Sequence, residues 1–482
     1  MLHKLALLAL VACFAAQEKP RLNVLFVAVD DLRPELGCYG NALVKSPHID
    51  RLAARGTVFN RAYCQQAVCS PSRSSLMTGR RPDSTKVYDL ETHFRKALPD
   101  VVTLPQHFKA HGYHAQGFGK IYHGGYDDPP SWSVPHQTSK KPGFGPEGQA
   151  LLQRLRDEAK KAGKDLTQRA NQPRGLPWEA PDVGDSELAD GGTADLAIEA
   201  LRALKDKPFF LAVGFLKPHL PFVAPKKYWD LYKESDFALP KNAAPPKDAP
   251  KYAPSNWGEL RAYHGMPKSG PVTDEQARKL IHGYYACVSY MDAQLGRILD
   301  ELERLGLREK TAVVLWGDHG WYLGEHGAWC KHTNYEYATR APLLVSAPGQ
   351  KAAGRRTDAL VEFVDIYPSL AEICGLPAPE GSEGTSFAPL LDDPARTWKR
   401  AAFSQYPRSV PGVGRAMGYS VRTDRWRLVE WAVPDKQYRE FELYDHGKDP
   451  NEDVNVAALP ENAAVVKELA EILRAGWKGS RP

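Results

Sequence analysis

Five short, almost continuous apolar runs constrain the fold of this 482-residue chain most strongly. Runs of this length without polar alternation are typical of strands covered on both faces, as in parallel sheets. Helical patterns lie between or after them. The alternation predicts an α/β sandwich with a mostly parallel central sheet. The expected strands are 23–29, 114–118, 209–215, 311–316 and 342–346, and the expected helices are 193–204, 274–305 and 367–374.

The pattern changes near residue 400. Three runs there indicate antiparallel strands, at 419–422, 426–431 and 441–444, and a helix is expected over 463–477. We therefore divide the chain into a main domain at 20–398 and a small C-terminal α+β subdomain at 399–482. Two stretches rich in proline, glycine and charge, 124–192 and 235–272, are expected to be insertions near the mouth of a site.

The N-terminus predicts export. Lys4 precedes an apolar run at 5–14, and the small residues Ala15 and Ala16 follow. This is the pattern of a signal peptide, placed at 1–16, and the run is too short to span a bilayer. Residues 10–13 also resemble a bacterial lipobox, in which Cys13 would carry a lipid. A secreted or periplasmic protein and a lipid-anchored one are the two alternatives, and only the second involves a membrane.

Charge and cysteine usage narrow the function classes. The formal net charge is +5, and charges of both signs are interleaved, which does not indicate a nucleic-acid partner. A weakly basic surface suits an anionic substrate, although ordinary surface charge explains it equally well. The seven cysteines include no CxxC pair and no disulfide framework, so most are expected to be small buried residues.

Ionisable side chains follow four of the predicted strands. The carboxyl ends of parallel strands share one edge of a sheet, where open α/β proteins bind their ligands. Any single case has a structural explanation, since an acidic pair after a strand is more often a turn or helix cap. Four coincident strand ends indicate a site instead. The groups are Asp30 with Asp31, Lys120 with His123, Lys217 with His219, and Asp318 with His319.

The residue types indicate a hydrolytic metal site. Asp30, Asp31 and Asp318 offer hard oxygen ligands that suit Ca²⁺ or Mg²⁺. Lysines and histidines nearby can hold a tetrahedral anion and move protons. Zinc is less favoured because no His/Cys spacing of the zinc type is present. These residues alone leave sulfate and phosphate esters both open as substrates.

One motif is more specific. Residues 69–73 read Cys-Ser-Pro-Ser-Arg and are followed by Thr78-Gly79-Arg80. Here the chain resembles the formylglycine-dependent sulfatases of the alkaline-phosphatase-like fold, in which a separate formylglycine-generating enzyme oxidises the motif cysteine. The hydrated aldehyde has two hydroxyl groups on one carbon: one attacks sulfur, and the other lets the aldehyde re-form and expel sulfate. An unmodified thiol at Cys69 would be a poor match for a hard cation.

The resemblance extends over nearly all of the mature chain and is closest to the iduronate-2-sulfatase branch of the family. Two residues separate Lys120 from His123, as in that branch, where many other sulfatases have one. The chain departs from the family at two positions. Most sulfatases carry asparagine where this chain has His319, although the iduronate branch shares the histidine, and His332 stands where that branch has tyrosine. The similar segments are 30–34, 37–40, 65–69, 78–83, 209–214, 217–219, 318–321 and 323–327.

The resemblance implies a role for each candidate residue. One Ca²⁺ ion would be bound by the modified Cys69 together with Asp30, Asp31, Asp318 and His319. Arg73 would hold the hydrated aldehyde by charge-assisted hydrogen bonds, and Lys120 would bridge the aldehyde and the sulfate. His123 would take the proton that triggers sulfate release. His219 and Lys331 would contact the sulfate and the leaving oxygen.

The function expected from this resemblance is that of an exo-acting glycan sulfatase on sulfated uronic acids or related sugars. Its partners would be a sulfated carbohydrate substrate and, during maturation, the formylglycine-generating enzyme. Two alternatives remain: a phosphonate or phosphate monoester hydrolase on the same fold, and a non-catalytic glycan-binding relative. Loss of Cys69, Arg73 or the metal carboxylates would mark the second, and all are present.

Overall fold

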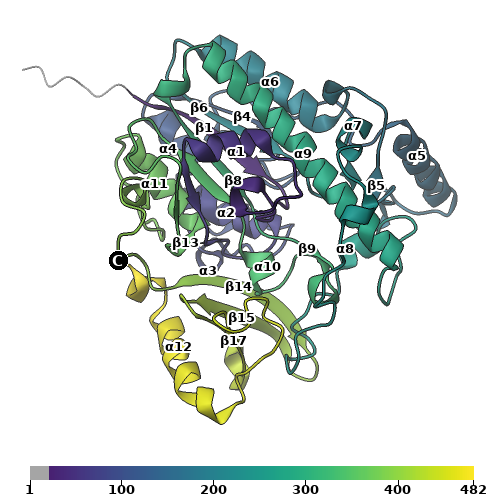
Figure 1. Cartoon of the computed structure of the whole chain (residues 1–482), viewed down its shortest axis with the longest axis vertical. Coiled ribbons are helices and arrows are strands. Elements are labelled where there is room, and N and C mark those ends of the chain that lie inside the picture. The colour runs from purple at the N-terminus through teal and green to yellow at the C-terminus, as the bar shows by residue number, and fades with distance from the viewer. Residues whose placement is uncertain (1–20) are drawn as a thin grey trace, which may run out of the picture.

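A seven-stranded sheet forms the centre of the molecule in the computed structural model, which describes residues 21–482 (Figure 1). The predicted signal peptide and Cys13 lie outside the described residues. The strand order is β12-β2-β11-β8-β1-β6-β4. These strands are β1 (Asn23–Val29), β2 (Thr57–Phe59), β4 (His114–Gly119), β6 (Phe209–Phe215), β8 (Thr311–Gly317), β11 (Leu343–Ser346) and β12 (Arg355–Thr357).

The sheet is mostly parallel, as predicted. Strands β4, β6, β1 and β8 run parallel to one another, whereas β11 is antiparallel to both β8 and β2. Every residue of β1, β6 and β8 is buried, which explains their continuous apolar sequences, because both faces of these strands are covered. The short strands β2 and β12 carried no comparable signal, and the sequence analysis did not place them.

Two groups of helices cover the sheet. Helices α1 (Pro47–Ala54), α6 (Ala189–Leu204) and α9 (Asp274–Arg304) form the first group, and α2 (Cys69–Thr78), α4 (Leu104–Ala110) and α11 (Ile366–Ile373) form the second. The long helix α9 begins where its sequence predicts. Thr273 Oγ1 accepts a hydrogen bond from the Gln276 backbone amide, and Gln276 Oε1 accepts one from the Thr273 backbone amide, which together form a capping box.

Shorter elements complete the main part of the chain. Helix α5 (Pro146–Lys161) lies at the periphery in Figure 1, within the predicted insertion at 124–192. The described part has no helix with the length and apolarity needed to cross a membrane. The other short helices are α3 (Pro82–Thr85), α7 (Lys226–Trp229), α8 (Gly258–Arg261) and α10 (Glu336–Thr339), and the two-residue strands are β3 (Ala62–Tyr63), β5 (Trp178–Glu179), β7 (Phe222–Val223), β9 (Tyr322–Leu323), β10 (Trp329–Cys330) and β13 (Val361–Glu362).

A separate antiparallel sheet follows near the C-terminus, with α12 (Ala463–Ala475) packed against it (Figure 1). Its strands are β14 (Ala402–Val410), β15 (Gly414–Arg422), β16 (Trp426–Val433) and β17 (Tyr438–Asp445). Buried ion pairs tie this sheet to the main part of the chain. Arg427 contacts Glu336 of α10 at 2.6 Å, and Glu362 lies 2.9 Å from Lys399 and accepts the Phe403 amide at 2.9 Å.

Candidate active site

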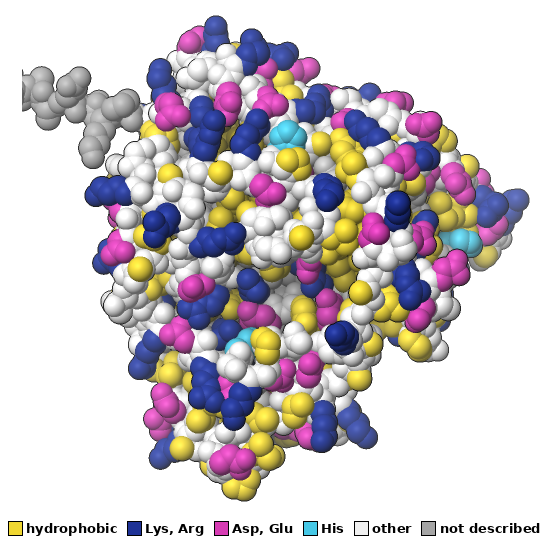
Figure 2. Space-filling model, viewed as in Figure 1, with side chains coloured by type: hydrophobic (Ala, Val, Ile, Leu, Met, Phe, Trp, Pro, Cys, Tyr) yellow, Lys and Arg dark blue, Asp and Glu magenta, His cyan; other side chains and the backbone are white. Residues whose placement is uncertain are grey.

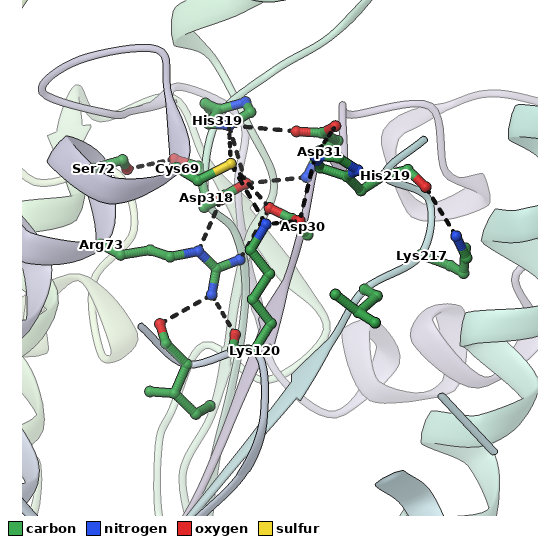
Figure 3. Close-up of polar contacts among 12 residues, drawn as sticks. Asp30, Asp31, Cys69, Ser72, Arg73, Lys120, Lys217, His219, Asp318 and His319 are labelled. Carbon is green, nitrogen blue, oxygen red and sulfur yellow. Dashed lines mark hydrogen bonds and ion pairs between the residues drawn. The ribbon is translucent and has the colours of Figure 1, made fainter. Parts of the chain in front are cut away.

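The carboxyl ends of β1, β4, β6 and β8 meet at one edge of the sheet because the strands end in register. Val29 pairs with Phe215 on one side and Gly317 on the other, and Gly119 pairs with Gly214. The next residues of each strand therefore enter the same space. Figure 3 shows Asp30, Asp31, Lys120, His219, Asp318 and His319 arranged around it.

Cys69 reaches this space from the first turn of α2 and is 2% exposed. Its Sγ lies 3.3 Å from Asp30 Oδ1, 3.5 Å from His319 Nε2 and 3.7 Å from Lys120 Nζ (Figure 3). The helix N-terminus and the lysine both favour negative charge at this position. Burial raises the pKa of the thiol well above its usual value, and Asp30 raises it further.

Arg73 lies one turn along α2, on the same helix face as Cys69. Its side chain is fully buried, with Nε 2.9 Å from Asp318 Oδ2 and a terminal nitrogen 3.3 Å from Asp30 Oδ1. It also donates to the Ile121 carbonyl at 3.0 Å. The guanidinium therefore connects α2 to the ends of β1, β8 and β4, which positions Cys69 among the carboxylates.

The five predicted metal ligands come together. One ligand atom from each of Asp30, Asp31, Cys69 and His319 lies within 4.8 Å of the others, and all four residues are buried. Asp318 adjoins them, since its Oδ1 accepts the Asp31 amide at 3.0 Å and lies 3.5 Å from His319 Nε2. His319 Nδ1 contacts the Gly320 carbonyl at 2.9 Å, so Nε2 is the nitrogen that faces the cluster.

The pKa values of the two adjacent aspartates, Asp30 and Asp31, are shifted in opposite directions. Burial alone would raise the pKa of Asp30, but Lys120, His219 and Arg73 outweigh it and hold this pKa well below the usual value. The pKa of Asp31 is raised, because burial outweighs the effects of His219 and Lys331. Asp31 also has a left-handed backbone with φ 59°, a conformation that aspartate tolerates better than most residues other than glycine.

Lys331 follows β10 and closes the opposite side of the cluster. Its Nζ lies 2.8 Å from Asp31 Oδ1, 3.0 Å from Glu259 Oε2 and 4.8 Å from the centre of the Trp321 ring. His219 completes the wall, with Nε2 3.0 Å from Glu259 Oε1 and 3.8 Å from Asp31 Oδ2. Both residues therefore lie beside the carboxylates, and their contacts with the sulfate and the leaving oxygen stay a prediction.

Glu259 is the site residue that the sequence analysis missed. It belongs to α8, inside the 235–272 stretch that was expected near the mouth of the site. Burial would raise its pKa, but Lys331 and His219 hold the pKa well below its usual value. No motif surrounds it, so only the predicted location of the insertion pointed in its direction.

Lys217 and His123 were also predicted at this sheet edge. Lys217 donates to the carbonyls of His219 at 3.1 Å and Pro221 at 2.6 Å, so it supports the loop that carries His219. His123 is half-buried, and its ring stacks on Tyr126 with ring centres 6.2 Å apart. The role of His123 stays a prediction.

The fold and the residues at this sheet edge define a hydrolase with the alkaline-phosphatase-like fold, and the comparisons identify its family. The sulfatase family model matches residues 22–376, and the model of the N-sulphoglucosamine sulphohydrolase C-terminal region matches 324–478. Iduronate 2-sulfatase of Mus musculus is 35% identical over 527 residues, covering 93% of each chain. The chain therefore belongs to the sulfatase family and is a sulfuric ester hydrolase.

Solved structures show the same fold. A protein in complex with its substrate D-glucosamine-2-N,6-O-disulfate superposes with a TM-score of 0.75 at 23% identity, covering 95% of this chain and 98% of the other. The phosphonate monoester hydrolase of Agrobacterium radiobacter superposes with a TM-score of 0.72 at 26% identity, covering 94% and 95%. The architecture is thus shared by enzymes that act on different oxyanion esters.

Proposed function

We propose that this sulfatase is an exported, calcium-dependent enzyme that acts on the chain ends of glycans and removes sulfate from uronic acids or related sugars. The observation that carries the proposal is the position of Cys69, whose Sγ lies within 3.7 Å of Asp30, His319 and Lys120. The likeness to iduronate 2-sulfatase over 93% of the chain supports the substrate class.

The residues present fit a hard divalent cation beside a modified Cys69. Three aspartates and the Nε2 atom of His319 converge, and Asp30 remains ionised because its pKa is held low. A buried thiol with a raised pKa stays protonated and is a soft, weak partner for calcium, whereas formylglycine would present oxygen there. When bound, the ion would stabilise negative charge on the attacking oxygen and on the sulfate.

The surrounding side chains support a division of labour. Arg73 and Lys120 would hold the hydroxyls of the hydrated residue 69, because both side chains meet its neighbour Asp30. His219 and Lys331 would face the sulfate and the leaving oxygen from the other side, where they share Glu259. His123 would accept the proton whose removal releases sulfate.

Export and maturation belong to the same proposal. The signal peptide pattern at 1–16 supports a secreted or periplasmic location, with a lipid at Cys13 as the alternative. A formylglycine-generating enzyme would be the maturation partner. Mass spectrometry of the mature protein distinguishes the secreted or periplasmic form from the lipid-anchored form, since it identifies the first residue and any lipid attached to it.

The activity is tested in two steps. Mass spectrometry of the Cys69 peptide, after co-expression with a formylglycine-generating enzyme, should show that the side chain has lost its sulfur and that the same β-carbon is now an aldehyde. The matured protein should then hydrolyse a disaccharide ending in a 2-O-sulfated uronic acid faster than it hydrolyses an aryl phosphonate. Faster turnover of the phosphonate would replace the proposal with the hydrolase activity named for the Agrobacterium relative. Persistent absence of the aldehyde would favour a glycan-binding protein.

A further inference from the structure

A groove of about 440 Å³ lies beside the catalytic cluster, at the junction with the C-terminal sheet. One side is formed by Val68, Tyr88 and His332, and the other by Tyr406, Arg408 and Arg415 of β14 and β15. The groove adjoins the cluster through the chain itself, because Val68 precedes Cys69 and His332 follows Lys331. The His332 amide also donates to the Ala67 carbonyl at 3.2 Å.

Arg408 is half-buried. The buried arginines Arg33, Arg73, Arg81, Arg422 and Arg427 each form an ion pair with at least one carboxylate. Arg408 forms none among the described residues. Its hydrogen-bond acceptors are backbone carbonyls: Ala253 at 3.1 Å, Pro407 at 3.2 Å, and His332.

These bonds leave the arginine ready to bind an anion. They use three of its five N–H donors, and Tyr406 also forms a side-chain hydrogen bond with the guanidinium, so at least one donor on the terminal nitrogens remains for an oxygen of a carboxylate or sulfate. The main electrostatic neighbours of the guanidinium are the neutral phenols of Tyr406, Tyr335 and Tyr322. It also lies over the Tyr406 ring, 4.7 Å from the ring centre. A half-buried cation held in place without a counter-ion is costly unless a ligand supplies the charge.

The acidic residues of the groove do not supply a negative partner for Arg408. Asp89 accepts hydrogen bonds from the Glu91 and Thr92 amides at 2.9 and 2.7 Å and from the Thr92 hydroxyl at 3.1 Å, so its oxygens are engaged within their own turn. Glu91 is exposed at the rim. Neither residue forms an ion pair with Arg408 or Arg415 in the described structure.

We infer that Arg408 forms an anion subsite for a second negatively charged group of the substrate, a carboxylate or an additional sulfate, bound while the scissile sulfate lies at Cys69. The inference rests on the proposed function and narrows it to glycans that carry two anionic groups close together. Because the Arg408 guanidinium donates to the carbonyl of His332, the subsite begins one residue from Lys331.

The test compares substrates as well as variants. The substrates are a disaccharide ending in a 2-O-sulfated uronic acid, its carboxyl-reduced form, its form lacking any second sulfate, and nitrophenyl sulfate. Arg408→Gln removes the charge but keeps a hydrogen-bond donor, and Arg408→Lys keeps the charge. Arg439→Gln is the matched control, since Arg439 lies on β17 of the same sheet and pairs with Glu430 at 3.3 Å.

For Arg408→Gln, KM for the full disaccharide should rise about tenfold or more relative to KM for nitrophenyl sulfate, because a charge-assisted hydrogen bond is worth at least one factor of ten in affinity. Arg408→Lys should raise this KM less than Arg408→Gln does, and Arg439→Gln should have the KM of the wild type. The control substrates identify the bound group. If Arg408 binds a carboxylate, the substitution should not raise KM for the carboxyl-reduced form; if it binds a sulfate, the substitution should not raise KM for the form that lacks the second sulfate.

An equal rise in KM for all four substrates would overturn the inference, because it would show that Arg408 only supports the fold. A wild-type protein that carries the aldehyde but hydrolyses none of the sulfates would contradict the proposed function instead. In that event calorimetric binding of the same disaccharides to the wild type and to Arg408→Gln still decides the subsite, and equal affinities reject it.

Discussion

Glu259 Oε1 lies 3.0 Å from Nε2 of His219, and the other oxygen of the same carboxylate lies 3.0 Å from Lys331 Nζ. A single acidic side chain from α8 therefore fixes two cationic or proton-carrying groups on the wall of the site. Lys331 contacts Asp31 as well, so Glu259 also acts on the carboxylate cluster through this lysine.

Replacing Glu259 with glutamine should lower kcat/KM about 100-fold, as expected when reacting groups shift by about 1 Å. The amide keeps the shape of the side chain but no longer attracts His219 and Lys331. Steady-state kinetics on the matured enzyme provide the measurement. Glu234→Gln serves as the control, because Glu234 pairs with Lys279 near the surface. Unchanged kinetics would remove Glu259 from the site.

Cys69→Ala should abolish sulfate release without loss of the fold. The side chain is small, and its contacts are polar ones within the cluster, so removing it leaves the apolar core intact. Turnover and circular dichroism measure the two effects. Cys287→Ala, at a fully buried cysteine on α9, is the control and should retain activity. Sulfate release by the Cys69 variant would show that another group is the nucleophile.

Asp30→Asn should weaken calcium binding more than loss of a residue that only orients a ligand would, which costs about 10- to 100-fold. The substitution keeps the volume of the side chain but removes the charge at the centre of the ligand set. Calorimetry of calcium with chelator-treated protein gives the affinity. Chelation of the wild type should likewise stop turnover and lower Tm, and both should recover with calcium. An unaltered calcium affinity in the variant would exclude Asp30 as a ligand.

Glu362→Ala should destabilise the fold by about 3–5 kcal/mol, because the substitution leaves the buried Arg81 guanidinium without its carboxylate partner, whereas Lys399 keeps Asp365 at 2.6 Å. Glu362 holds Arg81 through two bonds, at 2.7 and 2.9 Å, and Lys399 at 2.9 Å. Denaturant unfolding measures the loss. By contrast, Asp300→Ala breaks an exposed pair with Arg51 and should cost about 1 kcal/mol or less. Similar losses of unfolding free energy for the two variants would contradict the prediction that the buried ion pair stabilises the fold more than the exposed one.

Asp292 should make stability fall as pH rises from about 4 to about 7. Burial raises the pKa of Asp292 from 3.8 to about 7, while its carboxylate accepts the Ile49 amide at 2.7 Å and the His48 amide at 3.2 Å. A raised folded-state pKa contributes stability below the unfolded pKa and loses it as pH passes the folded value. Tm measured against pH should therefore decline more for the wild type than for Asp292→Asn. Parallel profiles would show that Asp292 does not titrate in this range.

Much of the architecture could be predicted from local sequence. Apolar runs such as 23–29 and 209–215 correspond to β1 and β6, because strands buried on both faces have no polar positions. The long helix α9 begins one residue after Thr273, as its capping residues indicate. Strand β2 carried too little local signal to be found, since only its pairing with β11 and β12 defines it.

The sequence by itself determined which chemical groups this protein carries: the motif at Cys69 and Arg73, and the ionisable residues after each strand. The sequence also predicted that the ionisable residues at the strand ends would lie close together, because parallel strands that end in register share one edge of a sheet. Only the tertiary structure decided that Glu259 bridges His219 and Lys331, and that Arg408 lies beside His332 with no carboxylate partner among the residues that the structure describes. These relationships join segments far apart in the chain through an irregular insertion and a second sheet, and neither hydrophobic periodicity nor motif spacing encodes such contacts.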